Sequence, residues 1–242
     1  MITFRRILPF FAFLLALPLF AQKKAAVPSG PAILENVEKT TAGVQDYIAK
    51  LEAQVDMERL RVPKMTATMY YRKPDKVHFE SPNFVMLPRE GIALNPAVLR
   101  ERYNASVVGE DTADGRNVVK VLLTGKQVKV RPNLLTLWID PTVWTIVKME
   151  SVPYQGRVLR IAFTYAETGG YWLPATLKAT FEMAERDTTM KRLDLGLQAP
   201  QLEELQRPIR NGTIFVKYLD YKINTGFSDD VFAKPENPPK GK

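Results

Sequence analysis

The sequence predicts a mainly β (α+β) protein whose core is a strongly curved antiparallel sheet wrapped around one or more helices. Three observations support this class. Apolar and polar residues alternate with a period of two in about ten segments. Turn sequences such as Asp114-Gly115 and Gly169-Gly170 separate neighbouring segments. One substantial helix is indicated, and it is too short to cover the concave side of such a sheet, so an apolar groove or cavity is expected.

The first 21 residues have the features of a secretory signal peptide. Arg5 and Arg6 precede an apolar run of 15 residues over 7–21, shorter than the roughly 20 residues of a bilayer span. We expect cleavage near Ala21 and a soluble, periplasmic mature protein, with a retained membrane anchor as the alternative. Cleavage lowers the formal net charge of +8 by two. The remaining positive charge either serves solubility or attracts the protein to anionic lipid headgroups.

The rest of the chain is expected to form one domain. Residues 22–30 are a linker, and the domain spans 31–233. Residues 185–211 interrupt the strand spacing with a polar segment, a long loop or insertion that is either functional or disordered. The tail over 234–242 contains three prolines and is expected to be disordered.

A helix and a long strand open the domain. Pro31 stands at a first helical turn, an apolar stripe follows on one helical face, and Gly43 ends the helix. The stripe consists of Ile33, Leu34 and Val37. From Asp46 to Glu58 the period changes to two, which predicts a strand with one apolar and one solvated face.

Further alternating segments predict a meander of strands. They lie at 65–72, 76–80, 85–87, 105–110, 117–123, 133–139, 143–150, 158–165, 171–183 and 213–224. A short helix is expected over 95–103. The pattern alone leaves open whether the sheet closes into a barrel.

Composition and motifs argue against an enzyme. The chain has no cysteine, which excludes Cys-ligated metal centres, thiol catalysis and disulfides. The single imidazole, His78, falls on the polar face of a strand and is expected to be exposed. No nucleophile-elbow, dinucleotide, phosphate-loop, zinc or calcium motif is present. We therefore expect no catalytic residue, no metal and no cofactor, and no nucleic-acid partner, because no basic cluster is interleaved with aromatic residues.

The candidate binding residues are apolar side chains concentrated in the first strands and rich in methionine, whose flexible thioether suits varied apolar partners. They are either ordinary core or the lining of a lipid-binding cavity, and both interpretations place them on one face. The candidates are Leu51, Ala53, Val55, Met57, Met65, Ala67, Met69, Tyr71, Val77, Phe79, Met86 and Leu137.

Three short stretches together resemble one family. They are YRKPDKVHFE at 71–80, LWIDP at 137–141 with IVKME at 146–150, and YLDYKINTGFSDDVF at 218–232. They are similar to the early hairpin, the central hairpin and the closing strand of the outer-membrane lipoprotein-carrier and lipoprotein-sorting (LolA-like) superfamily. The order of elements, from signal peptide to closing strand, also matches.

The resemblance implies a half-open, incomplete β-barrel with helices on one side and an apolar cavity that holds acyl chains. It implies a periplasmic carrier for the acyl chains of lipoproteins or lipids, transferring them towards the outer membrane. Such a carrier acts as a monomer and meets inner- and outer-membrane transfer proteins. The alternative is an envelope-stress or regulatory module of the same fold that senses lipid or binds a protein without transport.

Within this resemblance, the candidates for the lid or rim of the cavity are Arg72, Lys73 and Lys76. The segment over 185–211 departs from the family pattern as an insertion. The missing cysteine favours a shuttling carrier over a lipid-anchored acceptor, which would need a cysteine at its cleavage site.

Overall fold

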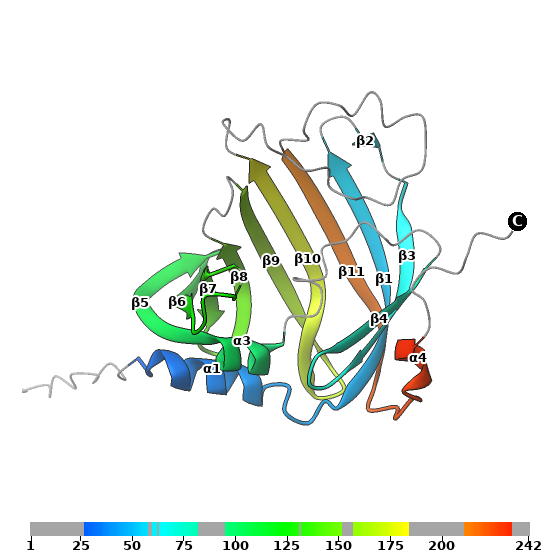
Figure 1. Cartoon of the computed structure of the whole chain (residues 1–242), viewed down its shortest axis with the longest axis horizontal. Helices are drawn as coiled ribbons and strands as arrows, with labels where there is room; N and C mark the ends of the chain where they lie inside the picture. The colour runs from blue at the N-terminus through cyan, green and yellow to red at the C-terminus, as the bar shows by residue number, and fades with distance from the viewer. Residues whose placement is uncertain are drawn as a thin grey trace, which may run out of the picture.

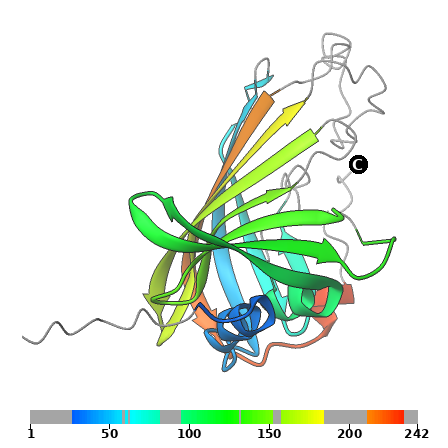
Figure 2. The same cartoon turned by 90° about the vertical axis from the view of Figure 1, so that its left-hand side faces the viewer.

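One open antiparallel sheet organises the protein (Figures 1 and 2). The computed structural model describes residues 27–57, 60–61, 63–81, 95–130, 132–151, 157–183 and 211–233. Its elements are α1 (Gly30–Lys39), β1 (Asp46–Met57), β2 (Leu60–Arg61), β3 (Met65–Arg72), β4 (Lys76–Glu80), α3 (Pro96–Arg102), β5 (Tyr103–Ala113), β6 (Arg116–Gly125), β7 (Leu134–Asp140), β8 (Thr145–Ser151), β9 (Arg157–Thr168), β10 (Tyr171–Met183), β11 (Asn211–Ile223) and α4 (Asp230–Ala233).

The strands follow the order β4-β3-β1-β11-β10-β9-β8-β7-β6-β5, and β2 pairs with β1. β4 and β5 form the two edges of this path, so the sheet does not close. Figure 2 shows that the part containing β5–β8 turns across the long strands β9–β11. The predicted class, a mainly β protein with a strongly curved, incomplete barrel, is therefore confirmed.

The predicted strands are present wherever the structure describes the chain, with shifts of one or two residues at most ends. One shift has a clear cause: β8 starts at Thr145 because a turn occupies the preceding residues. The Thr142 amide donates to Asp140 Oδ1 at 2.8 Å, and Trp144 has a positive φ of 52°. The predictions for 1–21, 85–87, Met86, 185–210 and 234–242 lie outside the described residues, as does most of the 22–30 linker.

The helix α1 packs at one end of the sheet, against α3 and β5 (Figure 1). Its stripe Ile33, Leu34 and Val37 is buried, as its spacing predicts. Gly30 is required at its start, because a Cβ there would lie 2.3 Å from the carbonyl oxygen of Ala105 in β5. The helices α1 and α3 and the first residues of β1 lie at the same end of the molecule, which is here called the helix end (Figure 1).

The side chains of β1 alternate between the inner and the outer side of the sheet. Ala49 to Met57 alternate between buried and exposed positions, with Lys50 and Glu52 among the exposed ones. The buried set pairs inward with the neighbouring strands, for example Ala49 with Met69 of β3. The alternation read from the sequence thus gives the correct faces.

A β-bulge in β11 changes which residues face inward. The register against β1 shifts between Ile48 and Lys50, opposite Asp220, which has a positive φ of 48°. The Lys50 ammonium pairs with the Asp220 carboxylate at 2.9 Å on the outer side. Because of the extra residue, Tyr218 and Tyr221 both pack against the inner core.

The prediction that His78 is exposed is wrong: only 2% of the residue is accessible. The strand alternation was read correctly, since His78 lies opposite Tyr70 on the outer face, away from Phe79. However, the outer face is covered here. Phe227 packs edge-on against Tyr70 at 5.4 Å between ring centroids, and α4 lies against β4.

Candidate functional site

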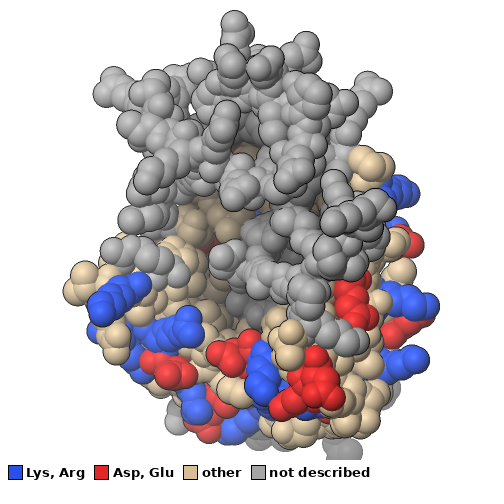
Figure 3. Space-filling view, turned by 45° about the vertical axis from the view of Figure 1, so that its right-hand side comes forward, with Lys and Arg blue, Asp and Glu red and all other residues tan. Residues whose placement is uncertain are grey.

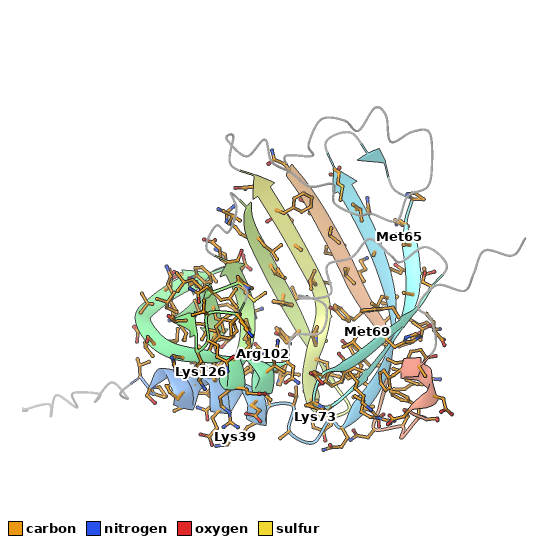
Figure 4. All side chains as sticks on the ribbon, in the orientation of Figure 1. Lys39, Met65, Met69, Lys73, Arg102 and Lys126 are labelled. Atoms are coloured by element: carbon orange, nitrogen blue, oxygen red, sulfur yellow. The ribbon has the colours of Figure 1, made fainter. Side chains whose placement is uncertain are left out.

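The inner side of the sheet is one continuous apolar surface. The predicted candidates that the structure describes all belong to it, and Leu51, Met69 and Leu137 are at most 1% exposed. Met65 and Met69 lie one behind the other along β3 (Figure 4). Val77 differs from the rest because it is only partly buried. Met86 lies outside the described residues.

Other inner-face residues keep part of their surface accessible, and sequence reasoning did not select them. They are Ala105, Val107, Leu159, Tyr165, Tyr171, Phe181, Tyr221 and Ile223. Alternation in β5, β9 and β10, together with the bulge in β11, places them inward, but alternation carries no information about which inward residues remain accessible. The accessible part of the inner face therefore involves β9–β11 and β5 more than the methionine-rich strands.

Phe181 shows how this accessible region is built. A Cβ on Gly212 of β11 would lie 2.3 Å from the Phe181 ring, so the ring of Phe181 lies over the glycine. Leu159 is the direct strand partner of Phe181. Two apolar side chains thus stand side by side on the inner face where neither is fully buried.

Five tyrosines gather towards the helix end of the same face, and we call them the tyrosine cluster. They are Tyr47, Tyr71, Tyr165, Tyr218 and Tyr221. Tyr47 stacks on Tyr71 with ring centroids 4.8 Å apart and meets Tyr221 edge-on at 5.4 Å. Tyr218 stacks on Tyr221 at 6.2 Å.

Backbone carbonyls accept the hydrogen bonds of three members of the tyrosine cluster. Tyr221 Oη donates to Pro174 O at 2.8 Å, Tyr165 Oη to Ile146 O at 3.0 Å and Tyr71 Oη to Pro74 O at 3.4 Å. Burial, followed by the negative charge of Asp75, raises the pKa of Tyr71 to about 12. These phenols are therefore neutral at any physiological pH.

The three rim candidates make contacts away from the inner face. Arg72 donates to the Asp229 carboxylate and to the carbonyl of Phe227, and its guanidinium lies 4.5 Å from the centroid of the Phe227 ring. Lys76 also pairs with Asp229, at 3.1 Å. The segment over 227–232, which Arg72 and Lys76 hold on the outer face of β3 and β4, is called here the C-terminal clasp.

Lys73 instead binds the end of the first helix. Its ammonium donates to the carbonyls of Thr41 at 3.0 Å and Ala42 at 2.8 Å. Figure 4 shows Lys73 at the helix end, together with Lys39, Arg102 and Lys126. Basic and acidic side chains intermingle on the described surface in Figure 3, which shows no large area of a single sign.

A buried carboxylate connects the clasp to β1. Asp46, 5% exposed, accepts hydrogen bonds from the Thr225 amide at 2.7 Å, the Thr225 hydroxyl at 3.0 Å and the Gly226 amide at 3.0 Å. Asn224 has a positive φ of 54° and Gly226 one of 64°, which turn the chain so that its amides point at the carboxylate. Asp46 therefore fixes where the closing segment leaves β11.

The described residues contain no group of three or more His, Asp or Glu side chains placed to hold a metal ion. Within the same ranges, no helix is long and apolar enough to cross a membrane.

Neither protein-family models nor curated protein sequences match the chain. Solved structures do. A DUF1329 family protein from Desulfovibrio piger is 12% identical with a TM-score of 0.58, over 85% of this chain and 98% of that one. A putative outer membrane lipoprotein-sorting protein domain from Vibrio parahaemolyticus is 13% identical with a TM-score of 0.54, over 84% and 95%. A LolA superfamily protein from Nitrosomonas europaea is 12% identical with a TM-score of 0.52, over 86% and 99%.

At such low identities the similarity is one of fold. The protein has a LolA-like fold, an open and strongly curved antiparallel sheet with few helices. This confirms, at the level of fold, the family resemblance carried by the short sequence motifs.

Proposed function

We propose that the protein is an exported, soluble carrier that binds acyl chains of lipoproteins or lipids on the inner face of its sheet and passes them towards the outer membrane. One observation carries this proposal. The buried side chains of the inner face form one apolar cluster, and further apolar side chains packed against it keep part of their surface accessible in an open sheet. The LolA-like fold and the signal-peptide features of residues 1–21 support the same function.

The energetics favour a binding surface of this kind. Burial of an acyl chain contributes about 0.8 kcal/mol per methylene, so a full-length chain exposed to water costs on the order of 10 kcal/mol. A lysine or arginine near a membrane surface contributes about 1 kcal/mol. The apolar inner face must therefore supply most of the affinity, and surface charges act mainly in docking to membranes or transfer proteins.

The test combines native mass spectrometry with a matched pair of leucine variants. Protein purified after export should carry a copurifying lipid, and the delipidated protein should bind a fluorescent acyl probe. Leu159→Gln changes the accessible inner face and should weaken the probe at least tenfold. Leu219→Gln makes the same chemical change on the outer face, where Leu219 is 38% exposed, and should leave binding unchanged.

A second assay separates carriage from sensing. A carrier should speed the movement of an acylated peptide between donor and acceptor vesicles, in proportion to its concentration. Binding without any transfer would instead indicate a lipid-sensing module of the same fold. Equal probe affinities for Leu159→Gln, Leu219→Gln and the unmodified protein would refute inner-face binding altogether.

A further inference from the structure

We propose that the tyrosine cluster binds the ester carbonyl of the acyl ligand, with Tyr47 as the donor, so that the site selects an uncharged acyl ester over a free fatty acid. This inference rests on the proposed function and names the chemical class of its ligand. It concerns the phenol hydroxyls of the tyrosine cluster, which are not required for binding an acyl chain by apolar contacts alone.

The first step is the placement of the phenols. Tyr47 comes from β1, Tyr71 from β3, Tyr165 from β9, and Tyr218 and Tyr221 from β11, the last two brought to one face by the bulge at Asp220. Strands far apart in the sequence thus direct hydroxyl-bearing rings to the same end of the inner face. An acyl chain lying along the apolar strands would reach these hydroxyls with its polar end.

The second step is the hydrogen-bond inventory. A buried phenol hydroxyl normally has a partner, and the hydroxyls of Tyr71, Tyr165 and Tyr221 each donate to a backbone carbonyl. Tyr47 is 8% exposed and no described residue accepts a hydrogen bond from its hydroxyl, which is itself not fully buried, so a ligand in place of water can reach it. An ester carbonyl is an acceptor only, so it fits a donor without a partner.

The third step is the charge of the surroundings. Burial, and then the neighbouring Tyr71, raises the pKa of Tyr47 well above its ordinary value, so the phenol is a neutral donor. Tyr47 packs against the rings of Tyr71 and Tyr221, which carry no charge at physiological pH. A fatty-acid carboxylate at the Tyr47 hydroxyl would lie beside these neutral rings, which is unfavourable in a largely buried site.

A purely structural role makes a different prediction. If Tyr47 serves only to stack on Tyr71 at 4.8 Å, its ring matters and its hydroxyl does not. Tyr47→Phe keeps the ring and removes only the hydroxyl. Tyr70→Phe is the matched control, because it removes a hydroxyl on the outer face that donates to Glu80 Oε2 at 2.9 Å.

The experiment compares two fluorescent probes of equal chain length, a diacylglycerol and the corresponding dialkyl ether, which lacks carbonyls. The unmodified protein should bind the diester about 3–10-fold more tightly than the diether, as expected for one hydrogen bond. Tyr47→Phe should remove this preference by weakening the diester alone, with an unchanged urea midpoint. Tyr70→Phe should lower the urea midpoint and keep the preference. Palmitate should bind more weakly than the diester to the unmodified protein at pH 7.

The outcomes separate the two proposals. A preference for the diester that survives in Tyr47→Phe, or tighter binding of palmitate than of the diester, would overturn the tyrosine assignment and leave acyl binding intact. Failure of every probe to bind the folded, unmodified protein would refute the proposed function and this inference with it.

Discussion

Replacement of Asp46 by alanine tests how strongly the closing segment is fixed to the sheet. The Asp46 carboxylate accepts two backbone amides, from Thr225 at 2.7 Å and Gly226 at 3.0 Å, and the Thr225 hydroxyl at 3.0 Å. In Asp46→Ala these donors lose their acceptor. Hydrogen bonds to a charged group contribute about 1.5–3 kcal/mol each, but water can reach Thr225 and Gly226, which are exposed residues. We therefore expect a loss of about 2–3 kcal/mol.

Urea unfolding followed by tryptophan fluorescence measures this loss, since the chain has three tryptophans. For a domain of this size, the expected destabilisation corresponds to a fall in Tm of roughly 4–12 °C. Asp46→Asn keeps one acceptor oxygen and should lose less than Asp46→Ala.

The control is Lys50→Ala, which breaks a pair whose side chains are 68% and 63% exposed. An exposed pair contributes about 0.2–1 kcal/mol at most, so this variant should remain close to the unmodified protein. If Asp46→Ala is no less stable than Lys50→Ala, the reasoning that the carboxylate fixes the closing segment is refuted.

Three further predictions concern stability and pH. Met69→Ala should lower the free energy of unfolding by about 2–5 kcal/mol because Met69 has no exposed surface, and a loss below about 1 kcal/mol would contradict its place in the core. The hydrogen bond from Lys76, with the charge of Arg72, lowers the pKa of Asp229, so the C-terminal clasp is intact above the ordinary value of 3.8 and loosens as the pH falls below it. Pepsin should cleave the clasp of the unmodified protein more readily at pH 2.5 than at pH 4.5. The cleavage at each pH is compared with that of Asp229→Asn at the same pH, which corrects for the pH dependence of pepsin itself. Because burial raises the pKa of Tyr71 to about 12 while an unfolded phenol ionises near 10, stability should fall as the pH rises above about 10; a constant urea midpoint from pH 9 to 11 would contradict this.

The local pattern of the chain determined the secondary structure and its faces. Period-two alternation depends only on neighbouring residues, so β1 could be predicted together with the inward orientation of Leu51 and the outward orientation of Glu52. The helical stripe of α1 was predictable for the same reason. Short motifs around the Lys73-Pro74 turn and in the closing strand were sufficient to indicate the LolA-like fold.

The candidate site was only partly predictable. The methionine-rich strands were correctly placed on the inner side, but Met69 is fully buried, whereas Phe181 and Leu159 keep accessible surface. Composition identifies apolar residues, and it does not reveal how densely the opposite side of a curved sheet packs against each of them.

Contacts between distant residues were decided by the tertiary structure alone. Arg72 binds Asp229, 157 residues later, because the closing segment runs over the outer face of β3, and the same segment contributes to the burial of the outward-facing side of this hairpin at His78. Likewise, the bulge at Asp220 turns both Tyr218 and Tyr221 inward, although they lie three positions apart and simple alternation would place them on opposite faces. The sequence by itself therefore determined the elements and most of their faces, since these follow from local periodicity. Strand pairing, curvature and the path of the closing segment decided which side chains meet, because those contacts depend on the packing of the whole sheet.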